Sequence, residues 1–253
     1  MYQVRIAMWS GPRNISTTMM RSFSSRSDTF VTDEPFYACY LQRTGLQHPG
    51  REEILRSCKR DYHSIINDIT SPVPAGKTVW YQKHMAHHLE HDDSLAWTQG
   101  LMNCLLIRTP AEVISSFSKK NELTDVNELG YLQQIQLYRY HNNKLPVVDA
   151  QDILQDPSGV LSNLCTRCGI PFEEAMLSWA EGPHPADGIW GKYWYDQLWA
   201  STAFKPYVQK KVTVSSALAA MVDQCMPLYE ELYQDRIRTN RYKPIIVDRL
   251  GRE

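Results

Sequence analysis

The first 26 residues place an apolar strand directly before a helix, with only a short polar loop between them. Residues 2–9 alternate, then run apolar, and stop at Ser10-Gly11-Pro12, which interrupts regular structure. Residues 16–26 contain neither glycine nor proline, carry apolar side chains at helical spacing, and offer the Ser16 hydroxyl as an N-cap. The sequence therefore predicts that the chain begins with a buried strand, a loop and a helix.

The alternation of strands and helices continues through the first two thirds of the chain. Further short strands are predicted at residues 29–32, 78–82, 103–107 and 145–149. Helices are predicted at residues 52–69, 111–120, 128–141, 158–168 and 215–233. Strands that alternate with helices form βαβ units. We therefore predict an α/β fold of three layers, a parallel sheet with helices on both of its faces.

The composition gives no sign of a second domain. The chain has 253 residues, of which 43% are hydrophobic, so it can bury a large core without disulfides or a structural metal. Residues 182–207 hold Trp190, Trp194 and Trp199 among glycine, proline and aspartate, which is too aromatic for a linker. We predict a single domain over residues 1–253, with residues 182–207 as an ordered covering segment.

The overall charge restricts the partners that the chain can have. Lysine and arginine number 27 against 28 aspartates and glutamates, a net charge of −1, which does not favour binding to nucleic acid or to an anionic membrane. No apolar run approaches the roughly 18–20 residues that span a bilayer, and the first residues do not resemble a signal peptide. We expect a cytoplasmic protein that captures any anion locally and acts on a small molecule.

The loop after the first strand has the outline of a phosphate-binding loop (P-loop). The first N–H groups of a helix are unpaired and its dipole favours anions there. Arg13 and the hydroxyls of Ser16, Thr17 and Thr18 stand at that point. The Gly-Lys-Ser/Thr of a Walker A loop is missing, so ordinary ATP or GTP hydrolysis is not predicted. A plain polar turn with a capping serine is the alternative interpretation.

The segment Pro12-Arg13-Asn14-Ile15-Ser16-Thr17 resembles the first loop of the sulfotransferase superfamily, Pro-Arg/Lys-Ser-Gly-Thr-Thr. That loop grips the 5′-phosphosulfate of 3′-phosphoadenosine 5′-phosphosulfate. The resemblance implies that the donor is bound by Arg13, Asn14, Ser16, Thr17 and Thr18. Ile15 stands at the usual glycine position, and a β-branched residue resists positive φ. Either the loop follows a different path here or the donor differs.

A second motif supports the same resemblance. The superfamily binds the donor's 3′-phosphate with an arginine at a strand end and a serine eight residues later. Here Arg108 follows the strand at residues 103–107, and Ser116 lies eight residues on, in the next predicted helix. The planar guanidinium suits phosphate because it donates paired, charge-assisted hydrogen bonds. Nearly the whole chain resembles a little-characterised sulfotransferase-like branch with Asp-Glu-Pro after the second strand and a tryptophan-rich tail.

Two residues are candidates for the base that sulfuryl transfer requires. Glu34, in Asp33-Glu34-Pro35, lies at the end of the second strand, where some superfamily members carry a glutamate base. His84, in Gln82-Lys83-His84, partly matches the Lys-Thr-His segment that carries the catalytic histidine of cytosolic sulfotransferases. Either group can serve near neutral pH, the glutamate if its pKa is raised. Lys83 is a candidate to assist at the bridging oxygen of the donor.

His84, His87, His88 and His91 would share one face of a helix. The motif H-E-x-x-H is absent, so we expect a solvated surface and no metal. The function that these features favour is a sulfotransferase that uses 3′-phosphoadenosine 5′-phosphosulfate and a hydroxyl or amine acceptor, and needs no metal. The alternatives are a phosphoryl transferase with a degenerate loop and a nucleotide-binding protein without catalysis.

Overall fold

The computed structural model describes residues 3–119, 122–209 and 212–239, and the strands in these ranges form one parallel sheet. The strands are β1 (Val4–Ser10), β2 (Thr29–Asp33), β3 (Val79–Met85), β4 (Met102–Ile107) and β5 (Val147–Asp149). Their order across the sheet is β2-β3-β1-β4-β5, with β1 in the middle. The chain places β2 at one edge, inserts β3 between β2 and β1, and then adds β4 and β5 on the other side of β1, so the direction of the connections reverses beside β1. Ligands of open α/β sheets bind where this happens, outside the carboxyl ends of the strands.

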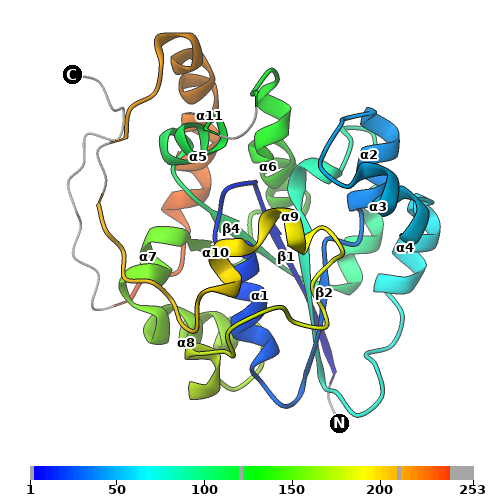
Figure 1. Cartoon of the computed structure of the whole chain (residues 1–253). Helices are drawn as coiled ribbons and strands as arrows, with labels where there is room; N and C mark the ends of the chain where they lie inside the picture. Colours follow the sequence, from blue (N-terminus) through cyan, green and yellow to red (C-terminus); the bar gives the residue numbers. More distant parts are fainter. Residues whose placement is uncertain (1–2, 120–121, 210–211, 240–253) are drawn as a thin grey trace.

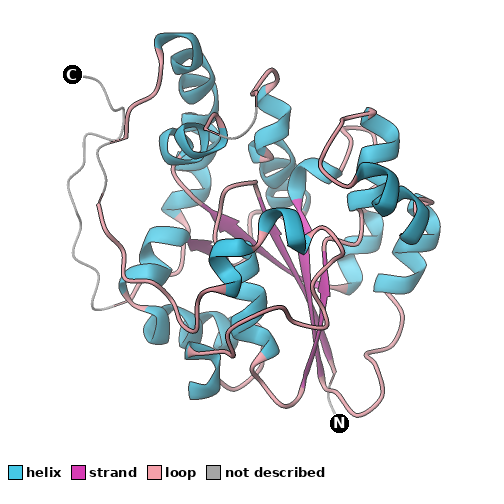
Figure 2. Cartoon of the chain, in the orientation of Figure 1, coloured by secondary structure: helices cyan, strands magenta, loops and turns pink. Residues whose placement is uncertain are grey.

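Helices cover both faces of the sheet, as Figures 1 and 2 show. Alternate residues of β1 point to opposite faces because the side-chain period of a strand is two. Ile6 and Met8 belong to one hydrophobic cluster, and Ala7 and Trp9 to the other. The helices are α1 (Ser16–Ser24), α2 (Tyr37–Thr44), α3 (Arg51–Ser57), α4 (Tyr62–Ile69), α5 (Pro110–Phe117), α6 (Tyr131–Tyr140), α7 (Ala150–Gln155), α8 (Pro157–Arg167), α9 (Gly191–Trp194), α10 (Asp196–Trp199) and α11 (Ser216–Gln234). The predicted three-layer α/β fold is confirmed.

Two predicted helices are wrong in extent. The helix expected over residues 52–69 is two helices, because Cys58 is extended and the Asp61 side chain accepts a hydrogen bond from the Ser64 N–H to start α4. The helix expected over residues 128–141 begins only after Gly130, whose φ of 78° separates it from the 3₁₀ turn η3 (Val126–Leu129). The sequence did not predict α2 or α7. The predicted strand start at residue 2 and helix end at residue 120 lie outside the described residues.

The predicted covering segment, residues 182–207, contains the short helices α9 and α10 and is tied to the body of the domain by buried polar contacts. Asp187 forms an ion pair of 2.6 Å with Arg21 of α1. The Gly188 N–H donates to Asp33 at the end of β2 over 3.0 Å. Figure 1 shows this segment in yellow, beside α1. Among the described residues, no helix combines the length and apolar character that crossing a bilayer requires.

Candidate active site

The loop between β1 and α1 turns at Arg13 rather than at Ile15. Arg13 has a φ of 55°, whereas Ile15 has a φ of −91° and is the N-cap of α1. The isoleucine therefore avoids the conformation that its branched side chain resists, which accounts for its presence at the usual glycine position. The loop also packs closely, since a Cβ on Gly11 would lie 2.3 Å from the carbonyl oxygen of Leu129.

Asn14 holds this loop against the sheet. Its Oδ1 accepts from the Ile15 N–H over 2.9 Å, and its Nδ2 donates to the Leu106 carbonyl of β4 over 3.1 Å. No side chain caps α1, so the predicted Ser16 cap is wrong. The start of the helix keeps its first N–H groups for a ligand. Ser16, Thr17 and Thr18 all line the same cavity as Arg13 and Asn14.

The two predicted phosphate-binding arginines lie side by side. Arg13 Nε donates to the Ser116 hydroxyl over 3.1 Å, and Arg108 Nη1 donates to the Arg13 carbonyl over 2.7 Å. Arg108 also pairs with Glu112 at 3.3 Å, whereas Arg13 contacts no carboxylate among the described residues. Burial, together with the nearby charge of Arg108, lowers the pKa of Arg13. An anion placed between these guanidiniums relieves their repulsion and restores the lost solvation.

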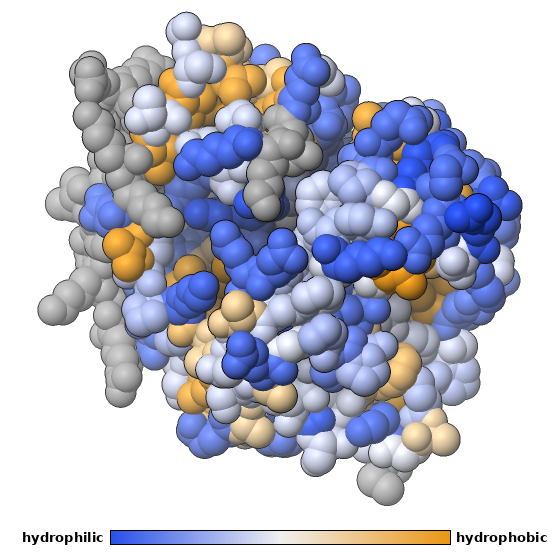
Figure 3. All heavy atoms as spheres, in the orientation of Figure 1, coloured by the Kyte–Doolittle hydropathy of each residue, from blue (hydrophilic) through white to orange (hydrophobic). Residues whose placement is uncertain are grey.

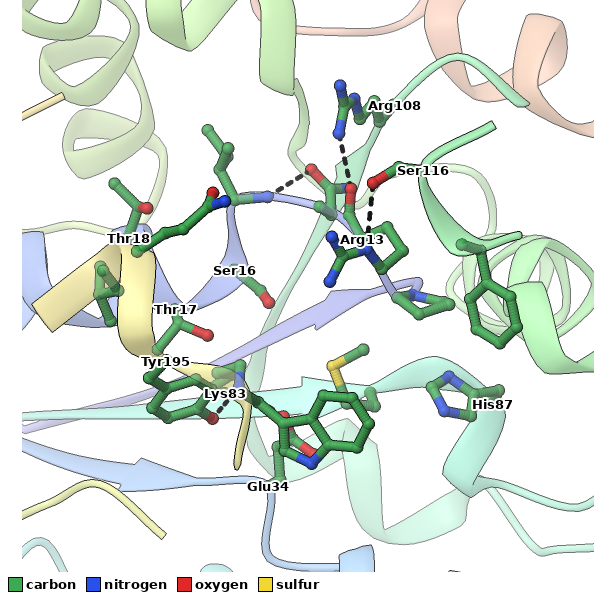
Figure 4. A pocket seen from close by; sticks show the side chains of 18 of the residues that line it. Arg13, Ser16, Thr17, Thr18, Glu34, Lys83, His87, Arg108, Ser116 and Tyr195 are labelled. Carbon is green, nitrogen blue, oxygen red and sulfur yellow. Dashed lines mark hydrogen bonds and ion pairs between the residues drawn. The ribbon is translucent and has the colours of Figure 1, made fainter. Parts of the chain in front are cut away.

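The opposite wall of the cavity carries a buried group of charges around Lys83 (Figure 4). Lys83 Nζ lies 2.9 Å from Asp33 Oδ1, 2.5 Å from Glu34 Oε1 and 2.8 Å from the Tyr195 hydroxyl. These contacts use all three donors of the ammonium group. Tyr195 in turn donates to Asp33 Oδ2 over 2.8 Å and accepts from Trp190 Nε1 over 3.1 Å. Lys83 thus holds Glu34, and all three of its donors are used here rather than left for the bridging oxygen, where it was expected to assist.

Glu34 is the carboxylate of this group that faces the cavity. Burial raises its pKa, and the charge of Asp33 adds to the rise, while Lys83 opposes it. A carboxylate with a raised pKa that remains paired with an ammonium group can accept a proton near neutral pH. The geometry of Glu34 therefore fits the base predicted from the sequence.

His84, the other candidate base, does not line the cavity. It follows Lys83 on β3 and so points to the other side of the strand, where its ring stacks on Trp9 with 4.2 Å between centroids. Its Nε2 lies 3.1 Å from Gln82 Oε1, and burial lowers its pKa to about 3. The structure brings the other predicted site residues into one cavity and leaves His84 outside it. These residues are Arg13, Asn14, Ser16, Thr17, Thr18, Glu34, Arg108 and Ser116.

The histidines after β3 do not form a helical row. His84 is still in β3, His87 and His88 belong to the 3₁₀ turn η1 (Ala86–His88), and His91 is exposed beyond it. The expected solvated face is therefore wrong for His84 and His88, which are buried. Within the described ranges, no three histidine, cysteine, aspartate or glutamate side chains are grouped as a metal site requires.

The cavity has a volume of about 530 Å³ and includes residues that no motif of the sequence assigned to this site. Tyr37 and Tyr40 reach it from α2, His87 and His88 from η1, and Tyr195 from the covering segment. No helix was expected where α2 lies, and the tryptophan-rich composition of residues 182–207 was the one signal that this segment matters. In the orientation of Figure 1, hydrophilic residues predominate on the face of the molecule that is turned towards the viewer (Figure 3).

The geometry agrees with comparisons to known proteins. A family model described as a sulfotransferase domain matches residues 4–235. Two Arabidopsis thaliana relatives, branched-chain-amino-acid aminotransferase-like proteins 2 and 1, are 34% and 32% identical over 231 residues, 90% of this chain. The chain spans only 41% of the length of these curated relatives.

Solved structures share the fold. The sulfotransferase domain of the Synechococcus PCC 7002 olefin synthase is 17% identical and has a TM-score of 0.55, with 90% of this chain and 95% of that one covered. A sulfotransferase from Alicyclobacillus acidocaldarius is 10% identical and has a TM-score of 0.53, with 94% and 98% covered. The fold, the cavity at the carboxyl ends of the strands and the family model agree, and the chain belongs to the sulfotransferase domain family.

Proposed function

We propose that this domain transfers a sulfuryl group from 3′-phosphoadenosine 5′-phosphosulfate to a hydroxyl or amine of a small-molecule acceptor. The observation that carries the proposal is the crowding of Arg13 and Arg108 at the start of α1, opposite the buried carboxylate of Glu34. Of these two neighbouring cations only Arg108 has a carboxylate partner among the described residues, Glu112, so the pair keeps a net positive charge. Such a pair fits a ligand with several negative charges. A carboxylate across the same cavity fits an acceptor that must lose a proton.

The residues on the side of the cavity that carries Arg13 and Arg108 divide into two groups. The start of α1 and the hydroxyls of Ser16, Thr17 and Thr18 are suited to the 5′-phosphosulfate. Arg108 and Ser116 are suited to the 3′-phosphate. Arg13 lies between them, since its side chain bonds to Ser116 and its carbonyl to Arg108. The bond between Arg13 and Ser116 can be exchanged for bonds from both side chains to a phosphate oxygen.

The chemical step requires only proton transfer and charge stabilisation from the protein. An acceptor oxygen or nitrogen attacks the sulfur, and the bond from sulfur to the bridging oxygen breaks, with its electron pair left on the phosphate. Glu34 accepts the proton of the acceptor. Lys83 keeps the carboxylate oriented through its 2.5 Å contact with Oε1. Arg13 and the N–H groups of α1 stabilise the negative charge that develops on the phosphate.

Isothermal titration tests the donor assignment without knowledge of the acceptor. We expect adenosine 3′,5′-bisphosphate to bind at least tenfold more tightly than adenosine 5′-monophosphate, because a charge-assisted contact contributes about 1.5–3 kcal/mol. Ser116→Ala should weaken binding of the bisphosphate alone. Ser118→Ala, two residues further and just beyond α5, is the matched control. Equal affinities for both nucleotides, or magnesium-dependent consumption of ATP, would refute the proposal.

A further inference from the structure

The acceptor end of the cavity is built from aromatic rings. We call the side chains of Tyr37, Tyr40, His48, His88 and Trp194, which line the cavity together with Glu34, the acceptor chamber. The name rests on the proposed function, in which Glu34 takes the acceptor's proton. Tyr37 lies close to Glu34, since the carboxylate contributes to the raised pKa of the Tyr37 hydroxyl. The chamber therefore begins where the chemistry is expected.

The ring faces in this chamber are largely covered by other rings. His88 lies between Tyr37 and Tyr40, with centroid distances of 5.3 Å and 4.6 Å and interplanar angles of 6° and 25°. Trp190 meets Tyr37 edge-on at 5.0 Å, and His87 meets Tyr40 edge-on at 5.2 Å. A flat acceptor thus finds few free faces on which to stack. What the stack offers to a ligand is the polar edges of its rings.

Two of these polar edges have no hydrogen-bond partner. The side chains of Tyr40 and His88 are 7% and 3% exposed, and neither makes a hydrogen bond with any described residue. Their polar atoms are not among the fully enclosed atoms that lack a partner in the described part of the chain, and both residues line the cavity, so these atoms open onto it. Tyr37, in contrast, is paired with His48 Nδ1 at 2.8 Å. Tyr40 and His88 are therefore available to pair with a ligand.

The chamber supplies hydrogen bonds without a free cation. Burial lowers the pKa of His88 and of His48, so both rings are neutral near pH 7, and burial raises the pKa of Tyr40, so its hydroxyl keeps its proton. Lys83 has used its three donors on Asp33, Glu34 and Tyr195. An anionic acceptor would lose its hydration here without gaining a counter-ion.

An amine is also a poor acceptor in this chamber. The carboxylates of Asp33 and Glu34 outnumber the single ammonium group of Lys83, so the group has a net charge of −1 when both are ionised. A negative charge beside an amine favours its protonated form, which has no lone pair to attack sulfur. A hydroxyl stays neutral under the same conditions and can still give its proton to Glu34.

We infer that the acceptor is an uncharged molecule with at least two hydroxyl groups, one sulfated beside Glu34 and another bonded by Tyr40 and His88. Aromatic diols and aliphatic polyols share this chemistry. The hydroxyl near Glu34 loses its proton to the carboxylate as its oxygen bonds to sulfur. The second hydroxyl stays intact and orients the molecule. Tyr40 and His88 are thus specificity-determining residues of the acceptor site.

Initial rates of sulfation, measured by mass spectrometry of the products at saturating donor, test the inference. The aromatic arm uses resorcinol and hydroquinone, their monomethyl ethers and the corresponding hydroxybenzoates. The aliphatic arm uses cyclohexane-1,3-diol and its monomethyl ether. We expect kcat/KM for the diols of at least one arm to exceed that of the ethers roughly fivefold to tenfold, the effect of one hydrogen bond. The hydroxybenzoates should be worse still.

The variant Tyr40→Phe removes one hydroxyl from the chamber and keeps the ring. It should raise the KM of a diol and leave the KM of its monomethyl ether unchanged, so that the preference for diols falls by half or more. Tyr81→Phe is the matched control, because it also removes one tyrosine hydroxyl without a partner among the described residues, but Tyr81 does not line the cavity. It should leave the preference intact.

The outcomes separate this inference from the proposed function. Titration with adenosine 3′,5′-bisphosphate is run on the same preparations. If the bisphosphate binds but the ethers or hydroxybenzoates react as well as the diols, or no diol reacts, the inference about the acceptor is wrong and the donor assignment stands. If the bisphosphate does not bind, the proposed function fails first. If the preference for diols survives in Tyr40→Phe, Tyr40 does not determine the acceptor specificity and that part of the inference is wrong.

Discussion

Glu34 has an unusual backbone conformation for its residue type. Its φ of 39° is in the left-handed region, which costs about 1–2 kcal/mol for a residue with a Cβ. The conformation is held by a hydrogen bond of 2.9 Å from its N–H to the Lys83 carbonyl and by one of 3.0 Å from the Tyr37 N–H to its own carbonyl. Residues kept in such conformations cluster at functional sites. The turn aims the carboxylate at the cavity instead of along β2.

Glu34→Gln tests whether this carboxylate is the base. We expect kcat to fall by about 10²–10⁴, the usual contribution of a general base, with unchanged affinity for adenosine 3′,5′-bisphosphate. The comparison variant is His84→Phe, whose ring lies on the other side of β3 and can still stack on Trp9. It should retain kcat within about threefold. A loss of activity in His84→Phe with full activity in Glu34→Gln would reverse the assignment.

At the scale of elements, the covering segment takes part in the site through Tyr195. The hydroxyl of Tyr195, just after α9, bonds to Lys83 and Asp33, and the Trp190 indole bonds to the same oxygen. A second contact, from Arg21 to Asp187, lies nearby, with both side chains less than 10% exposed. The segment thus helps to orient the group that carries Glu34, in addition to covering it.

Tyr195→Phe removes the hydroxyl and keeps the ring above Lys83. Tyr195 lowers the pKa of Glu34, and its hydroxyl bonds to Asp33 and Lys83 beside that carboxylate, so loss of the hydroxyl should raise the pKa of Glu34. With about 0.5–1.5 kcal/mol for the bond and about 1.4 kcal/mol per pKa unit, the acidic limb of the kcat profile should move up by roughly 0.4–1 pH unit. Tyr193→Phe, two residues earlier and inside α9, should leave the profile in place. A change in kcat without movement of the limb would indicate a structural role alone.

The elements also show what the sequence could and could not predict. The strand, loop and helix at the start, Arg108 after β4 and Ser116 in α5 follow from local patterns, because strand ends fix where such residues lie. His84 was misplaced because one residue along a strand reverses the face. Tyr40 had no local signal, His88 was expected on a solvated helix face, and Tyr195 was expected only as part of the covering segment. Their position in the cavity depends on how α2, η1 and the covering segment fold over the sheet, which no single window of sequence encodes.

At the scale of the whole molecule, buried histidines couple stability to pH. Burial lowers the pKa of both His84 and His87 to about 3, and lowers that of His88 as well. The unfolded chain takes up these protons below pH 6.5, whereas the folded protein resists them. The contribution of these neutral histidines to the free energy of unfolding is therefore complete above about pH 6.5. It is lost as the pH falls towards 3. Asp149 acts in the opposite sense, since burial raises its pKa to about 7.

The variant His84→Phe isolates the contribution of one histidine to the pH dependence of the free energy of unfolding. Because one pKa unit corresponds to about 1.4 kcal/mol, the wild type should lose about 3 kcal/mol more than the variant between pH 7.5 and pH 4.5. Urea unfolding of both proteins at the two pH values measures the difference. His63→Phe, which removes an exposed histidine, should follow the wild type. Equal losses in His84→Phe and wild type would mean that His84 is not held neutral in the folded protein.

The two walls of the cavity come from separate stretches of the chain. The proposed donor-binding groups lie between β1 and α1 and around α5, whereas the proposed acceptor chamber is assembled from α2, η1 and the segment around α9. Substitutions in α2 or α9 can therefore alter which molecule is modified while the nucleotide continues to bind as before. In evolution, or in the laboratory, new acceptor preferences are accessible through a few short segments, and libraries aimed at Tyr37, Tyr40 and Trp194 would explore them.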